Sequence, residues 1–219
     1  MIEQTSFKTN DLKFKLPFGM IISGPSSSGK TTFLLKLLQE KNELIIPQPK
    51  SVLYCYGQYH ENIPILSKLG VQLYRGPPTD EILNSLQKPA LLILDDLLTM
   101  IEEKKLSDLF IRMSHHYQMG IIFITQNLFD KKIKVARMNA QYIILMSAPN
   151  SALQIRNLGV QLFPKRLKFF LKSYRDATSV PYGYLVIDVN PASNPLLRLR
   201  TSIFKEDEEK ILYINNQDE

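Results

Sequence analysis

The feature that most constrains the fold of this chain is a run of eight residues near its N-terminus. Residues 24–31 read Gly-Pro-Ser-Ser-Ser-Gly-Lys-Thr and match the pattern G-x-x-x-x-G-K-[ST]. The apolar residues 18–23 before the run predict a buried strand, and residues 32–38 after it predict an amphipathic helix. A strand, a glycine loop and a helix in this order direct backbone N–H groups and the positive end of a helix dipole at one point. The sequence therefore predicts a phosphate-binding loop.

The residues of this loop have chemistry suited to a nucleoside triphosphate. Gly24 and Gly29 permit backbone angles and a close approach that a Cβ would block. We expect Lys30 to reach the β- and γ-phosphates of ATP and Thr31 to bind Mg²⁺. The residues expected to contact the nucleotide are Gly24, Pro25, Ser26, Ser27, Ser28, Gly29, Lys30, Thr31 and Thr32. A Ser/Gly loop that matches by chance is the alternative, and it leaves the flanking strand and helix unexplained.

The composition is that of a globular protein with one domain. The chain has 219 residues, of which 44% are hydrophobic and 22% charged. No apolar run is long enough to span a bilayer, and residues 1–16 contain charges but no apolar signal core. We therefore expect an intracellular protein that is not secreted and has no membrane partner. The single cysteine, Cys55, lies in an apolar run and is expected in the core, and the net charge of +6 favours a polyanionic partner without requiring one.

Apolar segments alternate with helical patterns along the chain, which predicts an α/β fold with a mostly parallel sheet flanked by helices. The predicted strands are 18–23, 51–56, 71–74, 90–94, 120–125 and 141–146. The predicted helices are 32–38, 63–69, 81–86, 106–118, 152–158 and 165–174. Residues 182–189 and 197–203 alternate like the strands of a C-terminal β-hairpin. We expect an N-terminal extension at 1–14, the P-loop domain at 15–204 and a charged tail at 205–219 that frays.

A second motif consists of an apolar strand that ends in two acids. Residues 91–96 read Leu-Leu-Ile-Leu-Asp-Asp, which has the form of a Walker B motif. Asp95 is expected to bind Mg²⁺, often through water, and Asp96 to polarise the attacking water. An apolar strand that ends in Asp is common by itself, so the interpretation depends on the phosphate-binding loop that precedes it.

Two further polar residues are candidates for catalysis. Gln126 follows the apolar strand 120–125 and could donate a hydrogen bond to the γ-phosphate or the lytic water; the alternative is a strand end that faces solvent. Phosphoryl transfer also gains from an arginine supplied by a neighbouring subunit. Arg112, on the predicted helix 106–118, is the first candidate for this arginine finger and Arg137 the second, and the alternative for Arg112 is an exposed helix position.

Basic residues form two groups late in the sequence. Lys131, Lys132, Lys134 and Arg137 follow the Gln126 strand, where a loop could contact DNA phosphates. In the second group aromatic residues at 169, 170 and 174 interleave with the cations, and we interpret this group as a solvated helix face with a core stripe and not as a DNA contact. Its basic members are Lys165, Arg166 and Lys168. The adjacent His115 and His116 cannot share a helix face, so we expect no histidine metal site.

With these motifs in place, the chain resembles the genome-packaging ATPases of Polinton/Maverick elements and adintovirus-like viruses. They belong to the FtsK-HerA superfamily, beside the poxvirus packaging ATPase. The motifs that carry the resemblance are residues 24–32, 92–96, 114–117 (Ser-His-His-Tyr), 123–129 (which include Thr-Gln-Asn), 174–178 and 181–184. The resemblance extends over about residues 15–204.

This resemblance implies a RecA-like ASCE core, with the Gln126 strand between the two Walker strands, and a ring that pumps double-stranded DNA into a capsid. Such a motor implies a capsid protein contact and a location in the host nucleus or at the site of virion assembly. Lys30, Thr31, Asp95, Asp96 and Gln126 match the family's nucleotide residues, and Arg112 matches an arginine usual in its helix.

The chain departs from the family pattern in two places. Asp96 stands where many members of the superfamily have Glu, and residues 147–150 lack an expected Arg-Asp pair.

Two other classes of P-loop protein remain as alternatives. A small-molecule kinase, such as a nucleoside or nucleotide phosphotransferase, would need an arginine-rich lid and an acceptor pocket, and the sequence contains no compact lid candidate. A GTPase would need an Asn-Lys-x-Asp loop to recognise the base, and the sequence contains none. Stimulation of turnover by double-stranded DNA would distinguish the motor from both.

Overall fold

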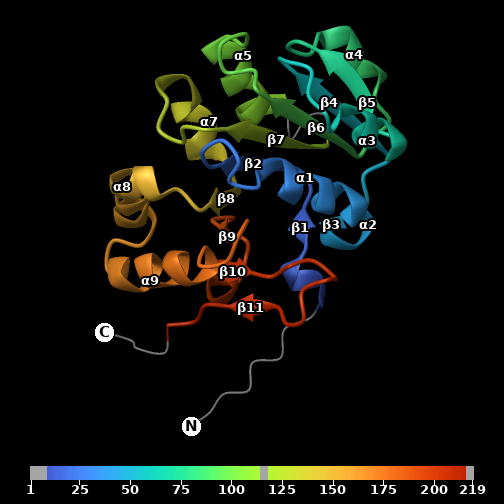
Figure 1. Cartoon of the computed structure of the whole chain (residues 1–219). Helices are drawn as coiled ribbons and strands as arrows, with labels where there is room; N and C mark the ends of the chain where they lie inside the picture. The colour runs from blue at the N-terminus through green and yellow to red at the C-terminus, as the bar shows by residue number, and fades with distance from the viewer. Residues whose placement is uncertain (1–8, 114–117, 216–219) are drawn as a thin grey trace.

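The fold is built on a nine-stranded sheet with helices on both faces (Figure 1). The computed structural model describes residues 9–113 and 118–215. The strand order is β11-β10-β9-β8-β2-β7-β6-β4-β5. Six neighbouring strands are parallel: β8 (Tyr142–Met146), β2 (Phe18–Ser23), β7 (Met119–Thr125), β6 (Ala90–Asp95), β4 (Ser51–Tyr56) and β5 (Gln72–Arg75). The mostly parallel α/β sheet predicted from the sequence is thus confirmed.

The predicted C-terminal hairpin is also present. Strands β9 (Tyr184–Asp188) and β10 (Leu199–Thr201) pair antiparallel and extend the sheet beyond β8. A buried ion pair between Asp188 and Arg200, with 3.3 Å between Oδ2 and Nη1, joins the two strands. The sequence predicted a tail that frays from Lys205 onward. Instead, β11 (Ile211–Leu212) pairs with β10, and Tyr213 donates a hydrogen bond to Asp176 at 2.6 Å.

The helices of the two faces are formed by separate parts of the chain. One face carries α1 (Lys30–Gln39), α2 (Lys41–Leu44) and α3 (Ile63–Lys68). The other face carries α4 (Asp80–Ser85), α5 (Glu103–Asp108), the π-helical turn η2 (Leu109–Met113), α7 (Lys134–Asn139), α8 (Ala152–Leu162) and α9 (Leu167–Ala177). In Figure 1, α1 and α2 lie on the right of the sheet and α7, α8 and α9 on the left.

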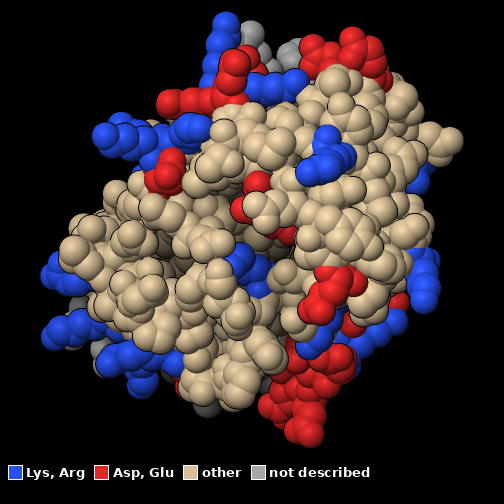
Figure 2. Space-filling view, turned by 45° about the horizontal axis from the view of Figure 1, so that its top comes forward, with Lys and Arg blue, Asp and Glu red and all other residues tan. Residues whose placement is uncertain are grey.

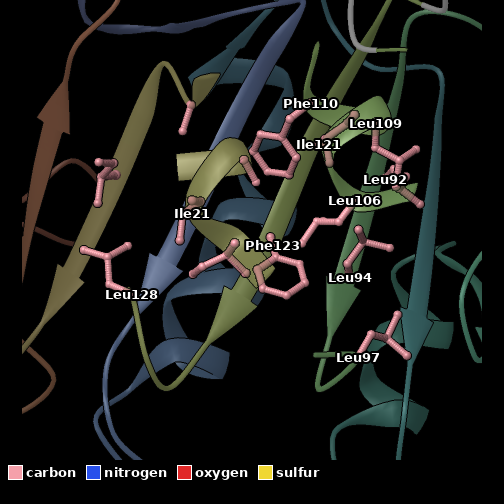
Figure 3. Close-up of a cluster of buried hydrophobic side chains, with 14 of the residues drawn as sticks. Ile21, Leu92, Leu94, Leu97, Leu106, Leu109, Phe110, Ile121, Phe123 and Leu128 are labelled. Carbon is pink, nitrogen blue, oxygen red and sulfur yellow. The ribbon is translucent and has the colours of Figure 1, made fainter. Parts of the chain in front are cut away.

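Alternate residues of the central strands supply the two cores. Ile21, Phe123 and Leu94 point to the face of α5 and η2, where they meet Leu106 and Phe110 (Figure 3). Their neighbours along the strands belong to the cluster under α1, which includes Ile22, Ile93 and Ile122. Side chains of consecutive strand residues point to opposite faces. Continuous apolar runs are therefore what a strand buried on both faces requires.

Three features differ from the sequence prediction. The predicted helix 106–118 begins earlier, at Glu103, and changes to the π-helical turn η2; residues 114–117 of its length lie outside the described part, and Gln118 has a positive φ of 49°. A small parallel pairing of β1 (Phe14–Lys15) with β3 (Ile45–Ile46) was not predicted, because two residues carry no periodicity. The remaining short turns are 3₁₀ helices: η1 (Thr9–Leu12), η3 (Lys131–Ile133), η4 (Pro149–Ser151) and η5 (Pro195–Leu197).

Within residues 9–113 and 118–215, no helix has the length and apolar character needed to cross a membrane.

Candidate nucleotide site

The loop between β2 and α1 has the close packing that its glycines predict. Gly29 adopts a left-handed φ of 99° and caps α1, a conformation that glycine reaches without a steric penalty. A Cβ built at Gly24 would lie 2.5 Å from Ser28 Oγ and 2.6 Å from Met146 Cβ, which is closer than a side chain can approach. The N–H of Gly24 donates to the carbonyl of Thr125 at 3.2 Å, so the loop is attached to the end of β7.

Lys30 lies inside this loop. Its Nζ donates hydrogen bonds to the carbonyls of Gly24 and Pro25, each at 2.7 Å. Burial lowers the pKa of Lys30, and the negative charges of Asp95 and Asp96 oppose that shift. The two acids are therefore close enough to Lys30 to interact with its charge across the site. Thr31 and Thr32 follow on the first turn of α1, Thr31 partly buried and Thr32 exposed.

The loop fits the phosphates of a nucleotide. The Oγ atom of Ser28 is buried and has no hydrogen-bond partner among the described residues, although buried polar atoms are nearly always bonded. An anion within the loop would supply that partner and would also face the N-terminus of α1. Thr31 and Asp95 are an oxygen pair suited to Mg²⁺, which usually takes only one or two protein ligands beside phosphate and water.

Asp95 is the last residue of β6, and two residues that the sequence analysis did not select surround it. Tyr54, from the neighbouring strand β4, donates a hydrogen bond to Oδ2 of Asp95, and the Tyr54 hydroxyl also lies 2.8 Å from Nε2 of His60. Burial raises the pKa of Asp95, while the Tyr54 hydrogen bond and the charge of His60 oppose the shift. The contacts among Tyr54, His60 and Asp95 could not be predicted from the sequence, because the sequence did not show that β4 is the neighbour of β6.

Asp96 has different surroundings although it is the next residue. Its side chain is exposed, and its backbone adopts a left-handed φ of 53°, which is uncommon for a residue other than glycine. A Cβ built at Gly57 would lie 2.3 Å from the carbonyl oxygen of Asp96. The N–H of Gly57 donates to the carbonyl of Asp95 at 3.1 Å. Gly57 thus allows the acidic turn to pack against the end of β4.

The sheet order brings Gln126 to the same edge. Strand β7 lies between β2 and β6, with Ser23 opposite Thr125 and Asp95 opposite Ile124. Gln126 is exposed and follows Thr125, whose Oγ1 accepts a hydrogen bond from the Asn127 N–H at 3.1 Å. The phosphate-binding loop, the two acids and Gln126 therefore follow the carboxyl ends of three adjacent parallel strands. Figure 2 shows a face of the molecule with acidic and basic side chains inside a hollow.

The two arginine candidates differ in what the structure describes. Arg112 belongs to η2, and its side chain is outside the described part of the structure. Its role as an arginine finger therefore stays a prediction. Arg137, on α7, donates from Nη1 to the carbonyl of Leu128 at 3.0 Å, and its guanidinium lies 4.2 Å from the centre of the Phe129 ring. Burial lowers the pKa of Arg137. Arg137 therefore holds the segment after β7 within its own subunit.

The basic residues after Gln126 lie near the same edge. Lys131 on η3 and Lys134 at the start of α7 are exposed. Lys132 is partly buried, and its Nζ donates to the carbonyl of Leu98 at 3.1 Å, so it links this segment to the one that follows Asp96. In the second basic group Lys165, Arg166 and Lys168 are exposed, whereas Phe170 is fully buried. Residues 115 and 116, the two histidines, lie outside the described residues.

Comparisons with known proteins agree with this architecture. No protein-family model matches the chain, and no curated protein matches it in sequence. The structure is similar to that of the genome packaging NTPase B204 from Sulfolobus turreted icosahedral virus 2 in complex with ATP-gammaS, with a TM-score of 0.52, 16% identity and coverage of 81% of this chain and 95% of that one. B204 from Sulfolobus turreted icosahedral virus, a DNA-packaging ATPase, gives a TM-score of 0.51, 15% identity and the same coverage.

The chain has the fold of a P-loop NTPase of the ASCE type. The insertion of β7 between the strand of the phosphate-binding loop and the strand of the two acids is the arrangement that the sequence resemblance implied. At 15–16% identity these neighbours establish the fold, and the chemistry depends on the residues described above.

Proposed function

We propose that this chain is an ATPase of the FtsK-HerA type that packages double-stranded DNA into a viral capsid. The observation that carries the proposal is the position of β7, which places Gln126 between the phosphate-binding loop and the acids of β6. Two structural neighbours are viral packaging NTPases. The sequence motifs resemble those of the Polinton/Maverick and adintovirus-like members, and we assign the chain to that group.

Within one subunit, hydrolysis would depend on three side chains and a bound metal ion. Lys30 would leave the carbonyls of Gly24 and Pro25 for the phosphates, which offer charged acceptors in place of neutral ones. Asp96 would accept a hydrogen bond from the attacking water, and Gln126 would orient that water or donate to the γ-phosphate. A bound Mg²⁺ would neutralise charge that develops on the phosphate oxygens.

The ion would be held by Thr31 and Asp95. Tyr54 fixes one oxygen of Asp95 by a hydrogen bond, which leaves the other oxygen available. Partners of this kind orient a ligand and are a usual part of metal sites.

A motor also needs a track and neighbouring subunits. Lys131 and Lys134 are exposed and would contact DNA phosphates, and the missing transition-state cation would come from Arg112 of the adjacent subunit in a ring. The motor would act where virions assemble and would contact a capsid protein there.

The experiment is a measurement of ATP hydrolysis by the purified protein with and without double-stranded DNA. We expect hydrolysis that needs Mg²⁺, rises with DNA and disappears in Lys30→Ala. Hydrolysis by Lys30→Ala equal to that of the wild type would reject the site. ATP consumption that is unchanged by DNA, but that increases with an added nucleoside and transfers the γ-phosphoryl group to it, would favour a small-molecule kinase instead.

A further inference from the structure

A cavity lies beside the phosphate-binding loop, on the side away from the acids. Its volume is about 530 Å³. The cavity is lined by residues 25–28 of the loop, Ser147 after β8, and residues 178–182 before β9. Strand β2 has β7 on one side and β8 on the other, so the cavity and the acids of β6 flank the loop from opposite sides. Residues 181–184 also belong to a motif that the hydrolysis mechanism does not use.

The segment before β9 is held in place by its own hydrogen bonds. The Thr178 hydroxyl donates to the carbonyl of Tyr174 at 2.7 Å, and the Ser179 hydroxyl donates to the carbonyl of Asp176 at 2.7 Å. The N–H of Gly183 donates to the carbonyl of Val180 at 3.0 Å. A Cβ built at Gly183 would lie 2.5 Å from the carbonyl oxygen of Ala177, so the turn closes tightly onto α9. This wall of the cavity is therefore preformed.

Tyr182 is the unusual residue of this wall. Its φ is 60°, a left-handed conformation that is strained for a bulky side chain, and 61% of the residue is exposed. It also lies against the loop, because a Cβ built at Gly29 would be 2.9 Å from Tyr182 Cβ. Backbone strain of this kind persists where the surrounding structure enforces it and clusters at ligand sites. An exposed aromatic ring beside a phosphate-binding loop is suited to contact the remainder of a nucleotide.

We propose that Tyr182 provides the surface on which the base of the bound nucleotide stacks, with the base and ribose in the cavity between residues 25–28 and 178–182. This inference rests on the proposed nucleotide site. A triphosphate whose γ end lies toward Asp95, Asp96 and Gln126 has its base end on the side of β8 and β9. Stacking on an aromatic face accepts any base, and the larger ring system of a purine covers more of that face.

The test separates the contribution of the base to binding from that of the phosphates by comparing a nucleotide with a ligand that has no base. Binding of ATP-gammaS with Mg²⁺ is measured by calorimetry, and inorganic tripolyphosphate is measured as a competitor. The proteins are the wild type, Tyr182→Ala, Tyr182→Phe and, as a matched control, Tyr59→Ala, which removes a tyrosine that is 69% exposed and lies after β4. We expect Tyr182→Ala to weaken ATP-gammaS binding about 5- to 100-fold. Tripolyphosphate binding should change by less than about twofold.

The controls make each outcome decisive. Tyr182→Phe and Tyr59→Ala should bind both ligands as the wild type does, and the preference of the wild type for ATP over CTP should shrink in Tyr182→Ala. Equal binding of ATP-gammaS by Tyr182→Ala and wild type would overturn the stacking role and leave the proposed ATPase intact. Equal loss for both ligands would also overturn it, because Tyr182 would then support the loop through Gly29. A wild-type protein that binds neither ligand would reject the proposed function itself.

Discussion

Asp95 and Asp96 are adjacent in sequence but have different surroundings, and this difference carries the assignment of their roles. Asp95 ends a buried strand, accepts a hydrogen bond from Tyr54 and is partly buried, so its position is fixed by the sheet. Asp96 is exposed and lies in a left-handed turn that points the chain out of the sheet. A metal ligand needs a fixed oxygen, whereas a carboxylate that orients water needs access to solvent and substrate.

Substitution of each acid by the neutral amide should separate the two roles. Asp96→Asn should bind ATP with Mg²⁺ and hydrolyse it about 10²-fold or more slowly, because the water loses its polarising carboxylate. Asp95→Asn should weaken the dependence of nucleotide binding on Mg²⁺. Calorimetry at several Mg²⁺ concentrations and a phosphate-release assay measure the two effects. Normal turnover in Asp95→Asn together with lost binding in Asp96→Asn would reverse the assignment.

Gly57 should be needed for turnover although it carries no functional group. In Gly57→Ala the new Cβ would meet the Asp96 carbonyl, so the acidic turn must move, and we expect a loss of about 1–3 kcal/mol in unfolding free energy. Gly70→Ala is the control, because its left-handed φ of 74° also disfavours alanine but nothing lies within 4 Å of its Cβ position. Both variants should unfold at lower denaturant concentration, and only Gly57→Ala should lose ATPase activity. Full activity in folded Gly57→Ala would show that the turn tolerates displacement.

At the scale of helices and strands, the sequence was informative wherever a segment was long and buried on both faces. Central strands such as β7 have continuous apolar runs rich in β-branched residues, as at Ile121–Ile124, and these runs are too short for a typical helix. The edge strand β5 has no such run and is partly exposed. Strands of two residues, β1, β3 and β11, have no pattern to detect. The contact of Tyr54 with Asp95 could not be predicted, because it depends on which strands are neighbours. The position of β7 between β2 and β6 was predicted from the family resemblance and not from periodicity.

The segment after β7 allows a prediction about DNA contact. Lys131→Ala with Lys134→Ala removes two exposed cations and leaves the Lys132 hydrogen bond to Leu98 in place. If both lysines contact phosphates, the slope of log affinity against log salt should fall by about 2, while ATP binding is unchanged. The matched control is Lys165→Ala with Lys168→Ala, which removes the same charge from another exposed surface. An unchanged slope in the first pair and a reduced one in the control pair would move the DNA contact to α9 and the turn before it.

At the scale of the whole molecule, the proposed hydrolytic site would still need a cation for the transition state. Among the side chains that the structure describes, neither Lys30 nor Arg137 is available for that role. Lys30 would already serve the phosphates, and Arg137 is held by Leu128 and Phe129 of its own chain. An ASCE site of this kind can be completed by an arginine from the next subunit, which raises the rate of hydrolysis about 10³–10⁵-fold. The remaining candidate from the sequence is Arg112, on the turn that follows α5.

Mixed rings should test whether Arg112 acts across a subunit boundary. Arg112→Ala and Lys30→Ala should each be inactive, because one lacks the arginine that completes its neighbour's site and the other lacks the loop cation. In a mixture, some boundaries pair an intact loop with an intact arginine, so part of the activity should return, and wild-type activity per subunit should rise with protein concentration as rings form. Arg112→Lys is the matched variant, since lysine keeps the charge without the planar donor geometry and should restore little activity. A mixture that stays inactive while both variants assemble, or full activity of Arg112→Ala alone, would remove Arg112 from the site.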